Sequence, residues 1–183
     1  MFWRKRPMQV REIVASDAFK RFGDAYLPMD VQLFVFELTQ RAKLPKESIP
    51  REAVLSAAVH NYIGEVENGG QNGFIGNSGW SAELLDEIRA GLKLIGLSEI
   101  SEIFAELEAY EKSDPARFHA SDWTDEVLQK LDDRMRPLCQ EAHRIHAAWL
   151  LSLPNIRIVP DSDFPHVRQA ISEAFQGTRP NAQ

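Results

Sequence analysis

The sequence predicts an all-α protein, a single-domain bundle of about seven helices. Nearly every long segment places apolar residues at three- and four-residue steps, the helical period. No apolar run approaches the roughly 20 residues that a membrane helix needs, so none of these helices is expected to span a membrane. A chain of 183 residues suits one compact domain. We therefore expect one helical domain over residues 1–183, with flexible ends at 1–8 and 177–183.

The clearest helical patterns lie in the first two thirds of the chain. They predict helices over residues 51–67, 82–95 and 99–112. Ser81 and Ser98 are candidate N-caps for the second and third of these helices, and a glycine at position 96 ends the second. The short connection between these two helices predicts an antiparallel hairpin.

A longer pattern covers residues 123–151, where an apolar side chain recurs at alternating three- and four-residue steps. Pro137 interrupts it, so a kink or break is expected near Met135 and Arg136, because proline lacks the backbone donor and clashes with the preceding turn. A final helix is expected over residues 164–175.

The N-terminal region is less clear. Residues 10–22 and 30–42 are predicted to be helical, although residues 33–36 also fit a buried strand. Residues 155–159 alternate like a strand, but no second convincing strand is present to pair with them. An extended connector is therefore expected there.

Charge is unevenly distributed along the chain, whose net charge is −6. Residues 1–46 hold 9 basic and 5 acidic side chains, whereas residues 47–114 hold 4 basic and 13 acidic ones. The acidic middle third would repel nucleic-acid phosphates, so it favours either a basic protein partner or simple solvation of an acidic face.

Two features bear on the compartment. The basic N-terminus, which includes Phe2 to Arg6, is followed by no apolar segment of signal-peptide length. Cys139 is the single cysteine and permits no internal disulfide. A cytoplasmic location, without a membrane partner, is expected.

The segment from Glu65 to Ser78 is the most distinctive motif. Its paired glycines predict a helix end, because glycine tolerates the left-handed conformation that terminates helices. The rest is expected to be a loop that inserts apolar side chains into the core and caps both helix ends. A ligand-binding loop is the alternative. The residues that define this signature loop are Asn68, Gly69, Gly70, Phe74, Asn77 and Ser78.

This arrangement of Asn-Gly-Gly, a nearby aromatic residue and Asn-Ser resembles a family of bacterial DNA-mimic-like proteins. The resemblance covers residues 50–161 and is strongest up to residue 110. Gln71 and Asn72 stand where that family more often has an aromatic and a polar residue. The best-described member of that family is a dimer that binds a transcription factor. The resemblance implies a non-enzymatic, homodimeric interaction protein that does not bind nucleic acid directly.

Glutamates supply the candidate partner-binding face. Three of them follow one another at helical spacing, and no Lys or Arg of the same helix lies three or four residues away. In a DNA mimic such carboxylates replace phosphates and compete for Lys and Arg on a basic DNA-binding protein or transcription factor. We call the five residues of this prediction the acidic face: Glu83, Glu87, Glu99, Glu102 and Glu106.

Other chemistry is not predicted. His143, His146 and Cys139 are too few for a metal site, and Ser78 lacks the surroundings of a nucleophile. Asp132 and Asp133 diverge on a helix. No catalytic residue, metal or cofactor is therefore expected. The alternatives are a small-molecule-binding or catalytic helical domain that uses the loop from Asn68 to Ser78, and an immunity- or antitoxin-like binder.

Overall fold

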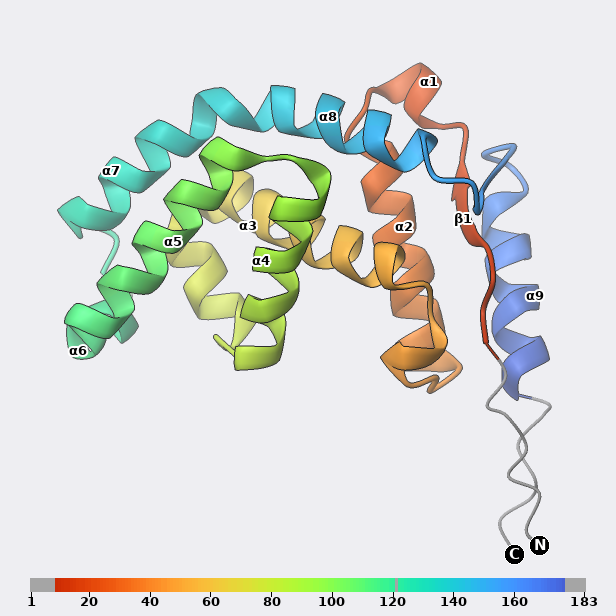
Figure 1. Cartoon of the computed structure of the whole chain (residues 1–183), viewed down its shortest axis with the longest axis horizontal. Coiled ribbons are helices and arrows are strands. Elements are labelled where there is room, and N and C mark those ends of the chain that lie inside the picture. Colours follow the sequence, from red (N-terminus) through yellow and green to blue (C-terminus); the bar gives the residue numbers. More distant parts are fainter. Residues whose placement is uncertain (1–8, 121, 177–183) are drawn as a thin grey trace, which may run out of the picture. The chain divides into compact units, whose positions relative to one another are not determined.

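The computed structural model describes residues 9–120 and 122–176 and confirms the all-α class (Figure 1). The ends predicted to be flexible, 1–8 and 177–183, lie outside the described residues. The chain folds into two compact units. The first unit comprises the residues up to Ala57 and from Leu150 onward, and the second comprises Ala58–Trp149. A single domain over 1–183 stays a prediction.

The first unit contains the strands of the described structure. β1 (Ile13–Ser16) and β2 (Ile156–Val159) pair in parallel, with Ile13 opposite Ile156 and Ser16 opposite Val159. The helix predicted over 10–22 and the connector predicted over 155–159 are therefore wrong at these strands. All four β1 residues are buried, and each strand supplies the partner that the other appeared to lack.

Helices pack against this strand pair. α2 (Tyr26–Phe36) follows the short α1 (Phe19–Phe22) and contacts β1, and α9 (Phe164–Gln176) runs beside β1 (Figure 1). α2 continues into a π-helical turn, Glu37–Arg41, so the helix predicted over 30–42 is confirmed and the strand alternative is wrong. A 3-10 turn, Lys46–Ser48, precedes the next helix.

A buried carboxylate fastens β1 to α2. Asp30 accepts hydrogen bonds from the backbone N–H of Ser16 at 2.8 Å and from its hydroxyl at 2.5 Å. Burial raises the pKa of Asp30, although both hydrogen bonds act in the opposite direction.

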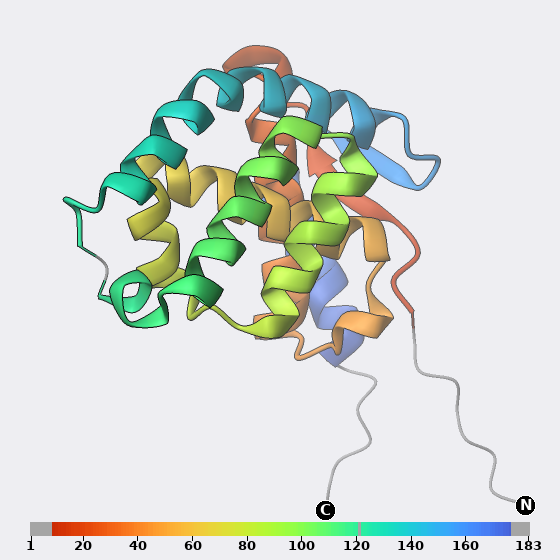
Figure 2. The ribbon, with the colours of Figure 1, turned by 60° about the vertical axis from the view of Figure 1, so that its left-hand side comes forward.

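The helices of the second unit follow one another closely. After α3 (Arg51–Ser78) come α4 (Ala82–Ile95) and α5 (Ser98–Ser113), which lie side by side and antiparallel (Figure 2), as predicted. Ser81 caps α4 by accepting from Leu84 N–H, and Gly96 ends α4 in the left-handed conformation. The predicted cap at Ser98 is wrong: Ser98 is the first residue of α5, and no side chain caps that helix.

The predicted long helix is broken where proline was expected to break it. α6 (Pro115–His119) was not predicted, and α7 (Glu126–Met135) begins three residues later than expected. A 3-10 turn, Arg136–Leu138, then separates α7 from α8 (Cys139–Leu151). The final helix is confirmed as α9. Within the described residues, no helix combines the length and apolar character required to cross a membrane.

Aromatic rings form the centre of the second unit's core. Tyr62 of α3 packs edge-on against Phe74 at 4.8 Å and against Phe104 at 5.0 Å between ring centroids. Trp80 extends the contacts from Phe74 to Phe118. These rings come from α3, α5, α6 and the connection before α4, so their packing joins these elements around α5, which carries three of the acidic residues named above.

Candidate functional site

The signature loop is largely helical. Gly70 breaks α3 with φ 62° and ψ −170°, so the predicted helix end at the paired glycines is confirmed. The expectation of an irregular loop over residues 71–78 is wrong, because the chain resumes a helix there and ends at Ser78. Asp132 of α7 explains this: its Oδ1 accepts from the Gln71 backbone N–H at 2.7 Å. A carboxylate at the start of a helix accepts a hydrogen bond from a backbone N–H that has no partner within the helix. Its negative charge also interacts favourably with the positive end of the helix dipole.

Burial holds the resumed helix in place. Phe74 and Ile75 enter the core, as predicted, and Gln71 is buried with its amide bonded to the Tyr62 hydroxyl at 3.2 Å. Burial raises the pKa of Tyr62, so its hydroxyl stays protonated and able to donate. These contacts explain why a glycine-rich sequence of low helix propensity becomes helical.

The three polar signature residues are engaged in local bonds. Asn68 donates to the Gly64 carbonyl at 2.8 Å, and the Ser78 hydroxyl accepts from Trp80 N–H at 3.2 Å. Asn77 instead donates to the Glu65 carboxylate at 2.7 Å, so its expected role at a backbone group is wrong. All three side chains therefore bond to groups of the second unit that lie close to them in sequence.

Replacement of Gly70 by alanine is expected to destabilise the protein by about 2–3 kcal/mol. A side chain at this positive φ costs about 1–2 kcal/mol, and an added Cβ would collide with the Asp132 carboxylate that caps the next helix. Urea unfolding followed by circular dichroism measures the change. The matched control is Gly76→Ala, where a Cβ meets open space and stabilisation by up to about 1 kcal/mol is expected. Equal effects of the two substitutions would contradict this account of Gly70.

The acidic face lies at the surface of the second unit. Glu83, Glu99, Glu102 and Glu106 are exposed, and Glu87 is half-buried. Because α4 and α5 are antiparallel, Glu83 and Glu99, each near the start of its helix, lie at opposite ends of the hairpin. The five residues therefore spread along the hairpin.

Cations from neighbouring helices interrupt this face. Arg134 of α7 binds Glu106 through two hydrogen bonds, Nη1 to Oε2 at 2.6 Å and Nη2 to Oε1 at 2.9 Å. This pairing lowers the pKa of Glu106. Arg89 of α4 binds Glu108 of α5 at 2.6 Å in the same way. The sequence pattern missed both pairs, because their partners lie 28 and 19 residues apart on different helices.

Glu99 and Glu102 each border a shallow cavity. The cavity at Glu99 has a volume of about 100 Å³ and lies between the start of α5 and α8, where Leu138 and Ile145 form apolar walls. The cavity at Glu102 has a volume of about 380 Å³ and lies between α4 and α5, where Lys93 and Arg89 contribute positive charge. Glu99 and Glu102 thus each lie beside a recess in the surface of the second unit.

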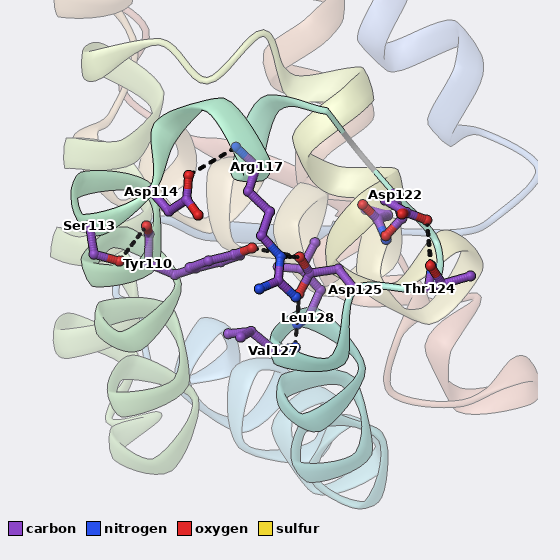
Figure 3. A network of polar contacts seen from close by, with 10 residues as sticks. Tyr110, Ser113, Asp114, Arg117, Asp122, Thr124, Asp125, Val127 and Leu128 are labelled. Atoms are coloured by element: carbon purple, nitrogen blue, oxygen red, sulfur yellow. Dashed lines mark hydrogen bonds and ion pairs between the residues drawn. The ribbon is translucent and has the colours of Figure 1, made fainter.

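A polar network closes the end of the second unit where α5, α6 and α7 meet (Figure 3). Asp125, only 3% exposed, caps α7 by accepting from Val127 and Leu128 N–H. It also accepts from the Tyr110 hydroxyl at 2.5 Å and from Arg117 Nε at 2.7 Å. Burial raises the pKa of Asp125, but these hydrogen bonds outweigh it and the net pKa is lowered. The network is a structural tie between three helices.

Histidines gather where α3 and α8 contact one another inside the second unit. His60 of α3 faces His143 of α8 with 6.0 Å between ring centroids, and His143 Nε2 lies 2.9 Å from the Glu67 carboxylate. Burial, with the nearby His143, lowers the pKa of His60 to about 4. Burial likewise lowers the pKa of His146 to about 3. Burial also raises the pKa of the Cys139 thiol to about 11, so it stays an unreactive buried thiol.

Across residues 9–120 and 122–176, no group of three or more His, Cys, Asp or Glu side chains is arranged to hold a metal ion.

Fold and surface together define an all-helical protein whose second unit carries 17 acidic and 8 basic side chains, a net charge of −9. The model of the family described as DMP19-like protein matches residues 47–152, more than half of the chain, and the chain belongs to that family. A search of curated proteins and a search of solved structures gave no match. The family expected from the sequence is thereby confirmed, whereas the roles of the signature residues stay predictions.

Proposed function

We propose that this chain is a DNA-mimic type of interaction protein, whose acidic second unit binds the Lys- and Arg-rich surface of a DNA-binding protein. The observation that carries this proposal is membership of the DMP19-like family over residues 47–152. The net charge of −9 on the second unit agrees with it, because carboxylates on a folded surface attract the same cations that phosphates do.

The residues of the acidic face differ in how available their carboxylates are to a partner. Glu106 is already bound by Arg134, so a partner's cation would have to share or displace that guanidinium. Glu99 and Glu102 are exposed and border the two cavities, so they are the residues that we propose contact the partner first. Glu83 and Glu87 would extend the contact along α4.

The alternative, a small-molecule-binding or catalytic domain built on the signature loop, has less support. Asn68, Asn77 and Ser78 are engaged in bonds within the second unit, and Phe74 is buried in its core. The two cavities described above lie along α4, α5 and α8 instead.

Reversing the charge of Glu99 and Glu102 together is expected to reduce partner binding by at least about tenfold, since a like charge would then face the partner's cations. The measurement is capture of proteins from the native host's lysate on the immobilised chain, quantified by mass spectrometry at low and high salt. The variant is Glu99→Lys/Glu102→Lys.

The control for this test is Glu47→Lys, an exposed charge reversal in the first unit. Circular dichroism should show unchanged helicity in every variant. If the Glu99→Lys/Glu102→Lys protein captures the same basic protein in the same amount as the wild type, these residues do not form the binding face.

Homodimerisation stays a prediction for this chain. Sedimentation equilibrium of the purified protein measures the mass directly, and a monomer at working concentrations would count against a dimeric mimic.

A further inference from the structure

An unusual apolar stripe lies on the first unit. Four large apolar side chains of α1 and α2 are well exposed: Phe22 (48%), Tyr26 (36%), Leu33 (39%) and Phe36 (55%). Together with half-buried Met29 they follow one another at steps of four, three, four and three residues. We call Phe22, Tyr26, Met29, Leu33 and Phe36 the apolar stripe.

The acidic side chains of α2 and of the π-helical turn after it are buried instead of exposed. Asp30, the charged residue of α2, is buried against Ser16 of β1. Glu37, at the start of the π-helical turn, is buried too and lies 3.8 Å from Arg168 of α9. A surface helix ordinarily buries its apolar side chains and exposes its charged ones. Here the solvent-facing side of α2 carries aromatic and aliphatic residues without a charge, a pattern typical of an interaction site.

The spacing indicates what shape fits the stripe. On α2 the apolar side chains from Tyr26 to Phe36 follow at three- and four-residue steps, which keeps them on one line along that helix, the arrangement by which one helix packs against another. Phe22 belongs to α1, before the non-helical Gly23, and joins the line because its ring lies 5.2 Å from the ring of Tyr26. The line is narrow, because the half-buried Ala25 and Gln32 border it. A lipid surface is better matched by a broad apolar face with cations along its sides. The geometry thus favours a helix as the occupant.

The charges at the two ends of the stripe indicate the chemistry of that helix. Lys20 and Arg21 are exposed beside Phe22, and Arg41 and Lys43 are exposed beyond Phe36. Arg41 contacts Glu37 at 3.3 Å yet keeps 65% of its side chain exposed. Asp24 is the exposed carboxylate in this region, so basic charge prevails around the stripe.

We propose that the apolar stripe binds an amphipathic helix of a partner protein, whose apolar side chains meet the stripe and whose acidic residues meet the basic ends. This surface is separate from the acidic face, which belongs to the other unit and would bind a basic partner. The chain would then have two binding surfaces of opposite charge preference.

Two synthetic helical peptides test the proposal. Both carry Leu at the positions that face the stripe, and they differ in having either Glu or Lys near both ends. Fluorescence anisotropy measures the binding of each labelled peptide to the full chain at low and high salt. The Glu peptide should bind more tightly than the Lys peptide, with a difference that shrinks at high salt.

Variants locate the binding on the stripe. The variant Leu33→Ser/Phe36→Ser should bind the Glu peptide about tenfold more weakly or worse, since large apolar side chains dominate such contacts. Lys20→Glu/Arg21→Glu should remove the preference for the Glu peptide. The control is Leu94→Ser, which changes a leucine of α4 in the second unit whose exposure, 49%, lies between those of Leu33 and Phe36, and which should leave binding unchanged. Thermal unfolding checks that each variant is folded.

Three results would overturn the proposal. Equal binding of the two peptides would show that the stripe does not select a helix with acidic residues. A dimer in sedimentation that Leu33→Ser/Phe36→Ser converts to a monomer would show that a second copy of the chain covers the stripe. Binding to phosphatidylglycerol vesicles that the same variant loses would assign the stripe to a membrane surface.

Discussion

Lowering the pH from about 7 to about 4 is expected to destabilise the second unit by several kcal/mol through the half-buried His60 and the fully buried His146. The pKa of His60 falls from 6.5 to about 4 on folding, and that of His146 falls to about 3. At a pH between 6.5 and these lowered pKa values, the two histidines bind protons in the unfolded chain but not in the folded chain. The stability is therefore complete above about pH 6.5 and is lost as the pH falls toward 4.

The size of this effect follows from the pKa of His60. A tenfold change in a proton-binding constant corresponds to about 1.4 kcal/mol, so this imidazole contributes about 3 kcal/mol of destabilisation by pH 4. His146 acts in the same direction. The groups that face them are Glu67 and His143, and protonation of His60 would bring positive charge toward the latter. A loss of this size is a large fraction of the roughly 5–15 kcal/mol by which a domain is stable.

The measurement is the free energy of unfolding in urea at several pH values. The double variant His60→Gln/His146→Gln should flatten its pH dependence between about 6.5 and 4, since glutamine does not titrate. Carboxyl groups titrate in the same range but are common to both proteins, so the difference isolates the histidines. The control is His166→Gln, an exposed histidine of α9. An unchanged slope in the double variant would exclude the histidines as the cause.

Replacement of Asp125 by alanine is expected to destabilise the protein by about 2–5 kcal/mol. The change removes the cap of α7, which costs about 0.5–2 kcal/mol, and leaves the buried Tyr110 hydroxyl without its acceptor, which costs about 1–3 kcal/mol. Arg117 loses the same acceptor but is 51% exposed, so water can hydrate its guanidinium. Urea unfolding at neutral pH measures it, and hydrogen exchange should show the largest loss of protection at the start of α7.

Two further substitutions make the Asp125 test specific. Asp125→Asn keeps an oxygen acceptor for the α7 N–H groups but loses the charge, so an intermediate loss is expected. Asp122→Ala is the control: its carboxylate accepts hydrogen bonds from nearby Thr124 at an exposed position, and a loss of less than about 1 kcal/mol is expected. If Asp125→Ala cost no more than Asp122→Ala, Asp125 would not tie the three helices together.

Features that depend on neighbouring residues were predictable from the sequence. α4 begins at the Ser81 cap and ends at Gly96, and the chain breaks at Pro137, because the signals lie within one turn of each boundary. The burial of Phe74 followed from its place in the motif. The surface position of most residues of the acidic face likewise followed from their charge and helical spacing.

Features that depend on distant residues were not predictable. β1 and β2 are four-residue strands at opposite ends of the chain, and neither has a strand neighbour nearby in sequence. The helix over residues 71–78 depends on Asp132, whose carboxylate bonds to Gln71 across 61 residues. The pairing of Glu106 with Arg134 escaped a search for cations within the same helix.

The central claim, that the acidic second unit takes the place of DNA on a basic protein, is tested most directly by displacement. The chain is immobilised, proteins are captured from the native host's lysate at low salt, and duplex DNA is added in increasing amounts. The account predicts that the duplex releases a basic DNA-binding protein from the wild-type chain. It also predicts that the Glu99→Lys/Glu102→Lys variant captures little of this protein before any DNA is added. Capture that duplex DNA does not reverse, or that the charge reversal does not reduce, would contradict it.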